Sequence, residues 1–315
     1  MISLSKFARI SAVAGVVAWL LLLLTTTSDL RETEVIHQVV FFGMLVVVPL
    51  GLSLVPIPGE QGSSLYRLAV LVQPVAALPA IASFYLETGP LAASLSAAWF
   101  ILAVLIAFIG LMRLKSRRPH PVEESAIDAG LLYLPVAGAW LVVYRLGVQP
   151  FEYGETIILL TVVHFHFAGF AAPIIAGMSG RVLATRKHPQ PLYTFSIFAI
   201  VASMPLVAAG ITFSPWLGLI GTLLLSAGLV MLAVLTVGWV IPAITPSSVR
   251  LLLFVGALSN CAAMVLACLY AYSLPMKILI IDIPTMALTH GLLNAFGFVA
   301  CSLLAWTIIA RERNM

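Results

Sequence analysis

Three histidines lie within apolar stretches that are long enough to cross a lipid bilayer. His164 and His166 belong to TVVHFHFAGFAAPIIAG, and His290 belongs to MALTHGLLNAFGF. An imidazole without partners in the hydrocarbon core costs roughly several kcal/mol, so such a ring is expected to face the protein interior. Imidazole exchanges protons near neutral pH and binds transition metals. We therefore treat His164, His166 and His290 as candidate catalytic groups or metal ligands.

Two glutamates begin expected spans that also carry histidine. Glu34 precedes His37 by three residues, and Glu155 precedes His164 by nine, which is about 13 Å along a helix. A buried carboxyl group can have its pKa raised toward neutrality and then serve as an acid or as an orienting group. Glu34 and Glu155 are therefore further catalytic candidates. His37 is a candidate for substrate binding or metal ligation.

The spacing within each stretch limits how these residues could act together. His164 and His166 are separated by about 200° around a helix, so they do not share a face. His290 and Asn294 are four residues apart, so they could hydrogen-bond each other or grip a common substrate group. Asn294 is therefore a candidate substrate-binding residue.

The Glu34–His37 pair has the spacing used in carboxylate-bridged di-iron bundles. Such bundles need the motif twice and two further glutamates, whereas it occurs once here. A structural salt-linked pair at a helix start is the favoured interpretation. We expect at least three of the candidate groups to converge in a pocket in the outer half of the bilayer, and their dispersal around the bundle is the alternative.

Membrane-spanning helices must position these groups. The 315-residue chain is 62% apolar and 9% charged, whereas soluble domains carry about 25% charged residues. Apolar runs of about 20 residues, the length needed to cross a bilayer, recur along the chain. We predict ten spans: 8–27, 36–55, 65–86, 91–112, 127–146, 155–178, 192–211, 216–242, 250–273 and 285–310. Because the links are short, we predict an all-α polytopic bundle that forms a single integral membrane domain over residues 1–315.

The basic residues predict the orientation of the bundle. Ten spans place both termini on one side, and no small-x-small cleavage site follows the first span, which we interpret as uncleaved. With the termini cytoplasmic, thirteen of the 16 lysines and arginines lie inside, and Arg31, Arg145 and Lys277 lie outside. The net charge of +4 is therefore a topology signal, and nucleic-acid binding is not expected. The basic run at 113–118 is expected to touch anionic lipid headgroups.

The ten spans could divide into two sets of five near the 145–155 loop. An odd number per half would give the halves opposite orientations, as in inverted-repeat transporters, but the halves show no convincing similarity. Prolines within the spans favour kinked helices around a cavity, because proline frees a backbone carbonyl. These prolines are Pro49, Pro74, Pro79, Pro135, Pro173 and Pro205.

Two resemblances bear on these motifs. The segments 164–170 (HFHFAGF) and 289–298 (THGLLNAFGF) resemble those of the YndJ-like bacterial membrane proteins. This resemblance extends to the size and span count and implies a bacterial inner-membrane protein, but it supplies no mechanism. The string HFHF at 164–167 is also similar to the haem-ligand string of haem–copper oxidases, although the copper motifs of that family are missing. That similarity implies a haem held by His164 or His166, with His37 or His290 as a second axial ligand.

Three functions are compatible with these features. The favoured one is a membrane-embedded enzyme that acts on a lipophilic substrate, such as an isoprenoid, quinone or lipid, by acid–base or metal-assisted chemistry. The expected partners are the lipid bilayer and this small molecule, and the cofactor could be haem or a single transition metal. A proton-coupled small-molecule transporter with ten spans is the first alternative. A haem-binding membrane protein is the second.

Overall fold

The computed structural model describes residues 3–25, 32–57, 63–117 and 119–312 and contains ten helices that are long and apolar enough to cross a membrane. They run over Leu4–Leu24, Thr33–Leu54, Ser64–Tyr85, Pro90–Ser116, Val122–Leu146, Glu155–Leu183, Gln190–Phe213, Pro215–Ala243, Ser247–Met276 and Ile283–Arg311. The predicted all-α fold and the ten spans are confirmed. The cytoplasmic placement of both termini stays a prediction, and Arg31 and Arg118 lie outside the described residues.

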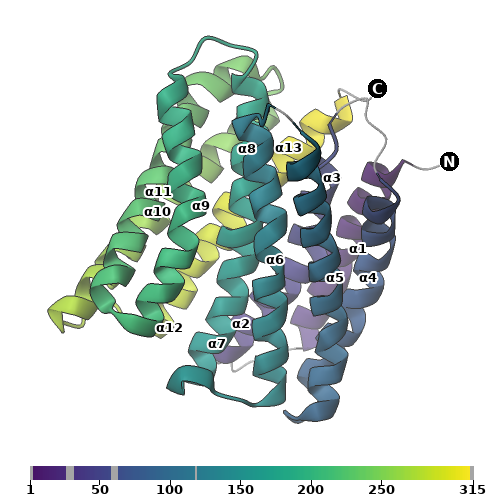
Figure 1. The fold of residues 1–315 in the computed structure, drawn as a ribbon, viewed down its shortest axis with the longest axis vertical. Helices are drawn as coiled ribbons and strands as arrows, with labels where there is room; N and C mark the ends of the chain where they lie inside the picture. Colours follow the sequence, from purple (N-terminus) through teal and green to yellow (C-terminus); the bar gives the residue numbers. More distant parts are fainter. Residues whose placement is uncertain (1–2, 26–31, 58–62, 118, 313–315) are drawn as a thin grey trace. The chain divides into compact units, whose positions relative to one another are not determined.

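Several spans consist of more than one helical segment (Figure 1). The α-helices are α1 (Leu4–Thr25), α2 (Glu32–Phe42), α3 (Val48–Leu54), α4 (Ser64–Ala82), α5 (Pro90–Ser116), α6 (Val122–Leu146), α7 (Glu155–His164), α8 (Ala172–Leu183), α9 (Gln190–Phe213), α10 (Pro215–Leu235), α11 (Ser247–Met276), α12 (Ile283–Met286) and α13 (Cys301–Glu312). Wider π-helical turns are η1 (Gly43–Val47), η4 (Phe165–Ala171), η5 (Thr236–Val240), η7 (Ala287–Gly291) and η8 (Leu293–Ala300). Short 3₁₀ turns are η2 (Ser83–Tyr85), η3 (Pro150–Glu152) and η6 (Ile241–Ala243).

Three of the π-helical turns have a recognisable cause in the sequence. Pro49, Pro173 and Pro242 each stand two residues after the end of η1, η4 and η5, respectively. A proline has no N–H to donate to the carbonyl four residues earlier and its ring crowds that carbonyl. In all three cases this carbonyl belongs to the preceding π-helical turn, where the wider backbone accommodates the ring. By contrast, Pro74, Pro79, Pro135 and Pro205 lie inside regular α-helices.

The described residues form two compact units. Unit 1 contains residues up to 120 together with 128–174, and unit 2 contains 121–127 together with 175–312. The division therefore falls inside two spans and does not coincide with the 145–155 loop, and the division into two sets of five spans stays a prediction. Close contacts at two glycines explain why the units divide within these spans. A Cβ on Gly177 would meet the carbonyl of Glu123 within unit 2, and one on Gly130 would meet the carbonyl of Phe170 within unit 1. The prediction of a single membrane domain stays a prediction.

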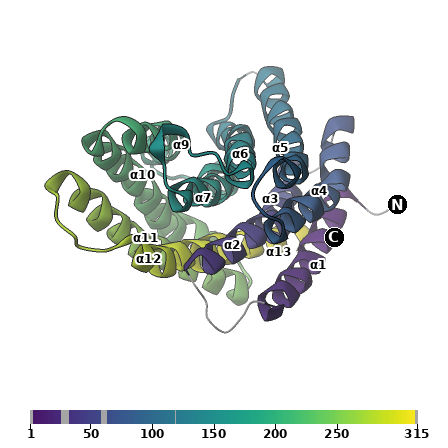
Figure 2. The same ribbon diagram turned by 90° about the horizontal axis from the view of Figure 1, so that it is seen from below.

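Unit 1 is built around the second span. Of its most apolar stretch, 83% is buried, compared with 17% for the first span. The helix α1 packs on η1 and α3, α2 packs on α7, and η1 packs on η4. Figure 2 shows α4 beside α5, which pack along one another. The central position of α2, η1 and α3 brings the His37 segment into the interior of this unit.

Unit 2 is dominated by three long helices. The helices α9, α10 and α11 pack in sequence order, as Figure 1 shows, and η8 and α13 pack on α11. Gly210 and Gly221 of the α9–α10 pair have no room for a Cβ, because backbone atoms of the facing helix would lie within 3.0 Å of it. This close approach fixes the α9–α10 hairpin. The last span, which carries His290, packs on α11 through η8 and α13.

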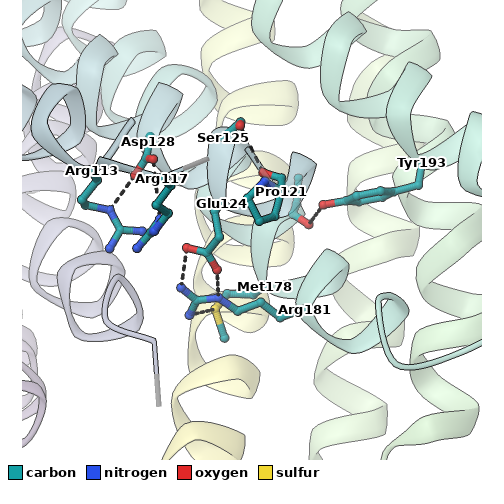
Figure 3. A network of polar contacts seen from close by, with 10 residues as sticks. Arg113, Arg117, Pro121, Glu124, Ser125, Asp128, Met178, Arg181 and Tyr193 are labelled. Atoms are coloured by element: carbon teal, nitrogen blue, oxygen red, sulfur yellow. Dashed lines mark hydrogen bonds and ion pairs between the residues drawn. The ribbon is translucent and has the colours of Figure 1, made fainter. Parts of the chain in front are cut away.

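Buried ion pairs anchor the start of α6 (Figure 3). In unit 1, Arg113 Nε donates to Asp128 Oδ1 at 2.5 Å, and Arg117 Nη1 lies 3.7 Å from Asp128 Oδ2. In unit 2, Arg181 binds both carboxylate oxygens of Glu124, at 2.6 and 3.0 Å. Two arginines of the predicted headgroup-binding run are therefore already engaged by a buried carboxylate.

Candidate functional site

The structure divides the predicted site residues between the two units. Unit 1 holds Glu34, His37, Glu155, His164 and His166, and unit 2 holds His290 and Asn294. His166 and His164 point in different directions from the same span, since His166 is fully buried whereas His164 is exposed. The prediction that these two histidines lie on different helix faces is confirmed.

His166 is locked by hydrogen bonds at both ring nitrogens. Its Nδ1 lies 2.8 Å from the carbonyl of Val162, which only accepts, so Nδ1 carries the proton. The indole Nε1–H of Trp99 donates to its Nε2 at 3.0 Å, and the two rings stack with their centroids 5.7 Å apart. With both nitrogens engaged and no exposed surface, His166 joins α5 to η4. This geometry favours a structural role over a catalytic one.

His164 lies two residues nearer the start of the same span. Its Nδ1–H donates to the carbonyl of Leu160 at 2.7 Å, within its own helix. The ring is exposed at the helix surface, so it does not share the interior with His166. His164 therefore lies at the surface of the bundle and not in its interior.

His37 forms the centre of an aromatic and polar cluster. Its Nε2 lies 2.8 Å from the hydroxyl of Tyr144, a residue of α6 that is 107 positions away in sequence. The ring of Phe84 from η2 packs edge-on against His37 at 4.8 Å between centroids, and the ring of Phe41 contacts both His37 and Phe84. The His37–Tyr144 pair joins two groups that both donate and accept, so a proton can pass between them.

Arg145 completes this cluster. It is 4% exposed, its guanidinium carbon lies 5.3 Å from the ring centroid of Phe84 and 5.6 Å from that of Tyr144, and its Nη2 donates to the carbonyl of Leu86 at 2.7 Å. Its Nε is buried and has no partner among the described residues, nor does Arg145 pair with a described carboxylate. An arginine expected in an outer loop is thus folded into the end of unit 1. The aromatic faces make this favourable, because cation–π contacts contribute about 0.5–2 kcal/mol each.

Glu34 lies one helical turn before His37 and keeps an unsatisfied oxygen. Its Oε2 is buried without a hydrogen-bond partner among the described residues. The expectation of a salt-linked Glu34–His37 pair is therefore wrong, since His37 binds Tyr144 instead. Glu155 is exposed in the first turn of α7, which packs on α2, and a carboxylate there is stabilised by the helix dipole.

The pair His290 and Asn294 forms a separate hydrogen-bonded unit. His290 Nδ1–H donates to the carbonyl of Ala263 at 2.8 Å, and Asn294 Nδ2 donates to His290 Nε2 at 3.1 Å. The predicted His290–Asn294 hydrogen bond is confirmed. At the start of the same span, outside the membrane, donation from the hydroxyl and the N–H of Thr285 lowers the pKa of Asp282 below its ordinary value. This interaction caps α12.

The described histidines do not gather around a shared metal ion. In the part of the chain that the structure describes, no three His, Cys, Asp or Glu side chains gather closely enough to hold a metal ion. Both nitrogens of His166 and of His290 are engaged by neighbouring groups, and Nε2 of His37 faces Tyr144. An iron would have to displace these partners. The sequence identified the histidines as candidates but did not identify Tyr144 and Arg145 as residues of the site. An adjacent Tyr-Arg pair at the end of a span is usually an interfacial anchor.

Comparison with known proteins places the chain in a family. The family model described as YndJ-like protein matches residues 38–298, which is more than half of the chain. The chain is 32% identical over 238 residues to the uncharacterized membrane protein YndJ of Bacillus subtilis (strain 168). This alignment covers 75% of the chain but 41% of the relative, so the chain spans about two-fifths of that protein's length. No solved structure matches the chain. The chain is a multi-pass membrane protein that belongs to the YndJ-like family.

Proposed function

We propose that this protein is a membrane-embedded enzyme that acts on a lipophilic substrate through the cluster of Glu34, His37, Tyr144 and Arg145. The observation that carries the proposal is the His37–Tyr144 hydrogen bond beside an arginine whose buried Nε has no partner among the described residues. Buried polar atoms are nearly always paired, so an exception is a reasonable place for a bound ligand. By the charge rule, this end of unit 1 faces the outer surface of the membrane.

The residues have complementary roles in this proposal. Arg145 binds a polar or anionic group of the substrate, while the apolar remainder lies along the bundle. The His37–Tyr144 pair takes a proton from the substrate, and Glu34 or the same pair returns one, as in an isomerisation or a cyclisation. Such a reaction needs no further reactant, because the proton that is removed is also restored. Glu155 and His164 lie along the neighbouring helix α7, where they orient the substrate.

Proton-coupled transport is the second candidate. It is favoured by the π-helical turns, which interrupt the second, sixth, eighth and tenth spans. Interrupted spans commonly surround ion and substrate sites in transporters.

Replacing Arg145 with methionine tests the substrate-binding role. Wild-type and Arg145→Met proteins in lipid nanodiscs would be incubated with an extract of membrane lipids, isoprenoids and quinones, and mass spectrometry would detect new product masses. We expect the variant to raise the half-saturating substrate concentration at least about tenfold, since one charge-assisted hydrogen bond contributes about 1.5–3 kcal/mol. The matched control is Lys277→Met, which removes an exposed cation.

Two outcomes would contradict the enzyme proposal. One is an unchanged half-saturating concentration in the Arg145→Met protein. The other is a wild-type protein that moves a component of the extract across proteoliposome membranes without altering its mass, which would establish transport instead.

A further inference from the structure

Unit 2 contains a small cavity, lined by six apolar and four polar residues, that none of the candidate site residues reaches. Its volume is about 10 Å³, which is the space of a single water or of a dehydrated sodium-sized ion. Four polar side chains line it from four different segments, and each is at most 7% exposed. They are Ser179 of α8, Thr236 of η5, Asn260 of α11 and Ser302 of α13.

Asn260 lines this cavity and has an unpaired side-chain oxygen. Its Nδ2 donates to the carbonyl of Leu229 at 2.8 Å, which fixes the orientation of the amide. The remaining Oδ1 has no hydrogen-bond partner among the described residues. Water does not replace that partner from outside, because Asn260 is only 1% exposed. A buried amide oxygen left in this way destabilises the fold unless a ligand satisfies it. The oxygen can only accept, so the ligand must be a cation or a hydrogen-bond donor.

The other three groups are hydroxyls that can also offer lone pairs. Ser179 donates its hydrogen to the carbonyl of Ile175 at 3.1 Å, so its oxygen remains able to accept. For the hydroxyls of Thr236 and Ser302, no partner occurs among the described residues. Thr236 opens the π-helical turn η5, where its N–H is shared between the carbonyls of Leu232 and Ala233, two further residues that line the cavity.

The side chains that line the cavity determine which kind of ligand it can bind. The polar side chains that line the cavity are an amide and three hydroxyls, and no carboxylate is among the lining residues. Hard cations prefer oxygen ligands, and divalent cations are bound chiefly by carboxylates. We propose that unit 2 binds one dehydrated monovalent cation of sodium size between Ser179, Thr236, Asn260 and Ser302. The ion holds α8, η5, α11 and α13 together. Sodium binding at this cavity does not depend on the function proposed for unit 1.

Binding of radioactive sodium to the purified protein in nanodiscs tests the site, together with the unfolding temperature in sodium, potassium or N-methylglucamine chloride. We expect one sodium ion per chain and an unfolding temperature that is higher in sodium by at least about 4 °C, as follows for a ligand well above its dissociation constant. Asn260→Leu should abolish both effects. Ser203→Ala is the matched control, because Ser203 is a buried serine of α9 that bonds Ile200 and does not line the cavity.

A second variant keeps the test decisive if Asn260→Leu does not fold. Ser302→Ala removes one hydroxyl oxygen and should weaken sodium binding at least about tenfold, while Ser203→Ala binds as the wild type does. A wild-type protein that binds no sodium and unfolds at the same temperature in all three salts would show that the cavity holds a water only. Equal sodium affinity in Ser302→Ala and the wild type would also overturn the proposal. Neither result would affect the turnover assay of the unit 1 cluster.

Discussion

Replacing Asp128 with alanine is expected to lower the free energy of unfolding by about 3–5 kcal/mol. Asp128 is 1% exposed and lies six residues after the start of α6, about 9 Å along the helix. Its carboxylate is shared by Arg113 and Arg117 (Figure 3). Without it, two largely buried guanidinium groups would remain in a region of low dielectric constant with less compensation. Breaking a buried pair on one side costs far more than the pair contributes.

Reversible unfolding in mixed micelles, followed by the loss of helical circular dichroism, would measure this change. Lys115→Ala is the matched control, since it removes an exposed charge from the same basic run and should alter stability by at most about 0.5 kcal/mol. If Asp128→Ala unfolds with the same free energy as Lys115→Ala, the ion pairs at the start of α6 do not stabilise unit 1.

Replacing Trp99 with alanine is expected to lower the free energy of unfolding by about 3–5 kcal/mol through the loss of buried volume. Trp99 is fully buried and also supplies the N–H that satisfies Nε2 of His166. Trp99→Phe keeps most of the ring but removes the donor, so it should cost about 1–3 kcal/mol from the unpaired imidazole nitrogen. The same micelle titration separates these two contributions.

Trp216 provides the comparison for this series. It is 55% exposed on α10, so Trp216→Ala should stay within about 0.5 kcal/mol of the wild type. A Trp99→Phe protein as stable as the wild type would mean that His166 has no need of the indole N–H. His166 would then again be a candidate catalytic residue.

The span count could be predicted from the sequence because it depends on local composition. Runs of about 20 apolar residues are sufficient to identify a helix that crosses a bilayer. The faces of His164 and His166, and the hydrogen bond between His290 and Asn294, were likewise predictable, since they follow from positions on one helix. Each of these relations involves residues that are four or fewer positions apart.

The contacts of the candidate site depend on the packing of distant helices. The partner of His37 is 107 residues away and that of His166 is 67 residues away. No periodicity identifies Tyr144 or Trp99 as these partners, because an aromatic residue in a span is usually a packing residue. Arg145 was expected in an outer loop, since a single charge at a span end is normally solvated. Its burial requires the rings of Phe84 and Tyr144, which only the folded chain brings together.

Turnover of the lipid extract by His37→Ala protein tests the proposed site most directly. General acid–base groups contribute about 10²–10⁴-fold to a rate, so the variant should convert substrate at least about 100 times more slowly while it remains folded. His120→Ala, which removes an exposed histidine, should keep the wild-type rate. A His37→Ala protein that is folded and converts substrate at the wild-type rate would contradict the assignment of the site to this cluster.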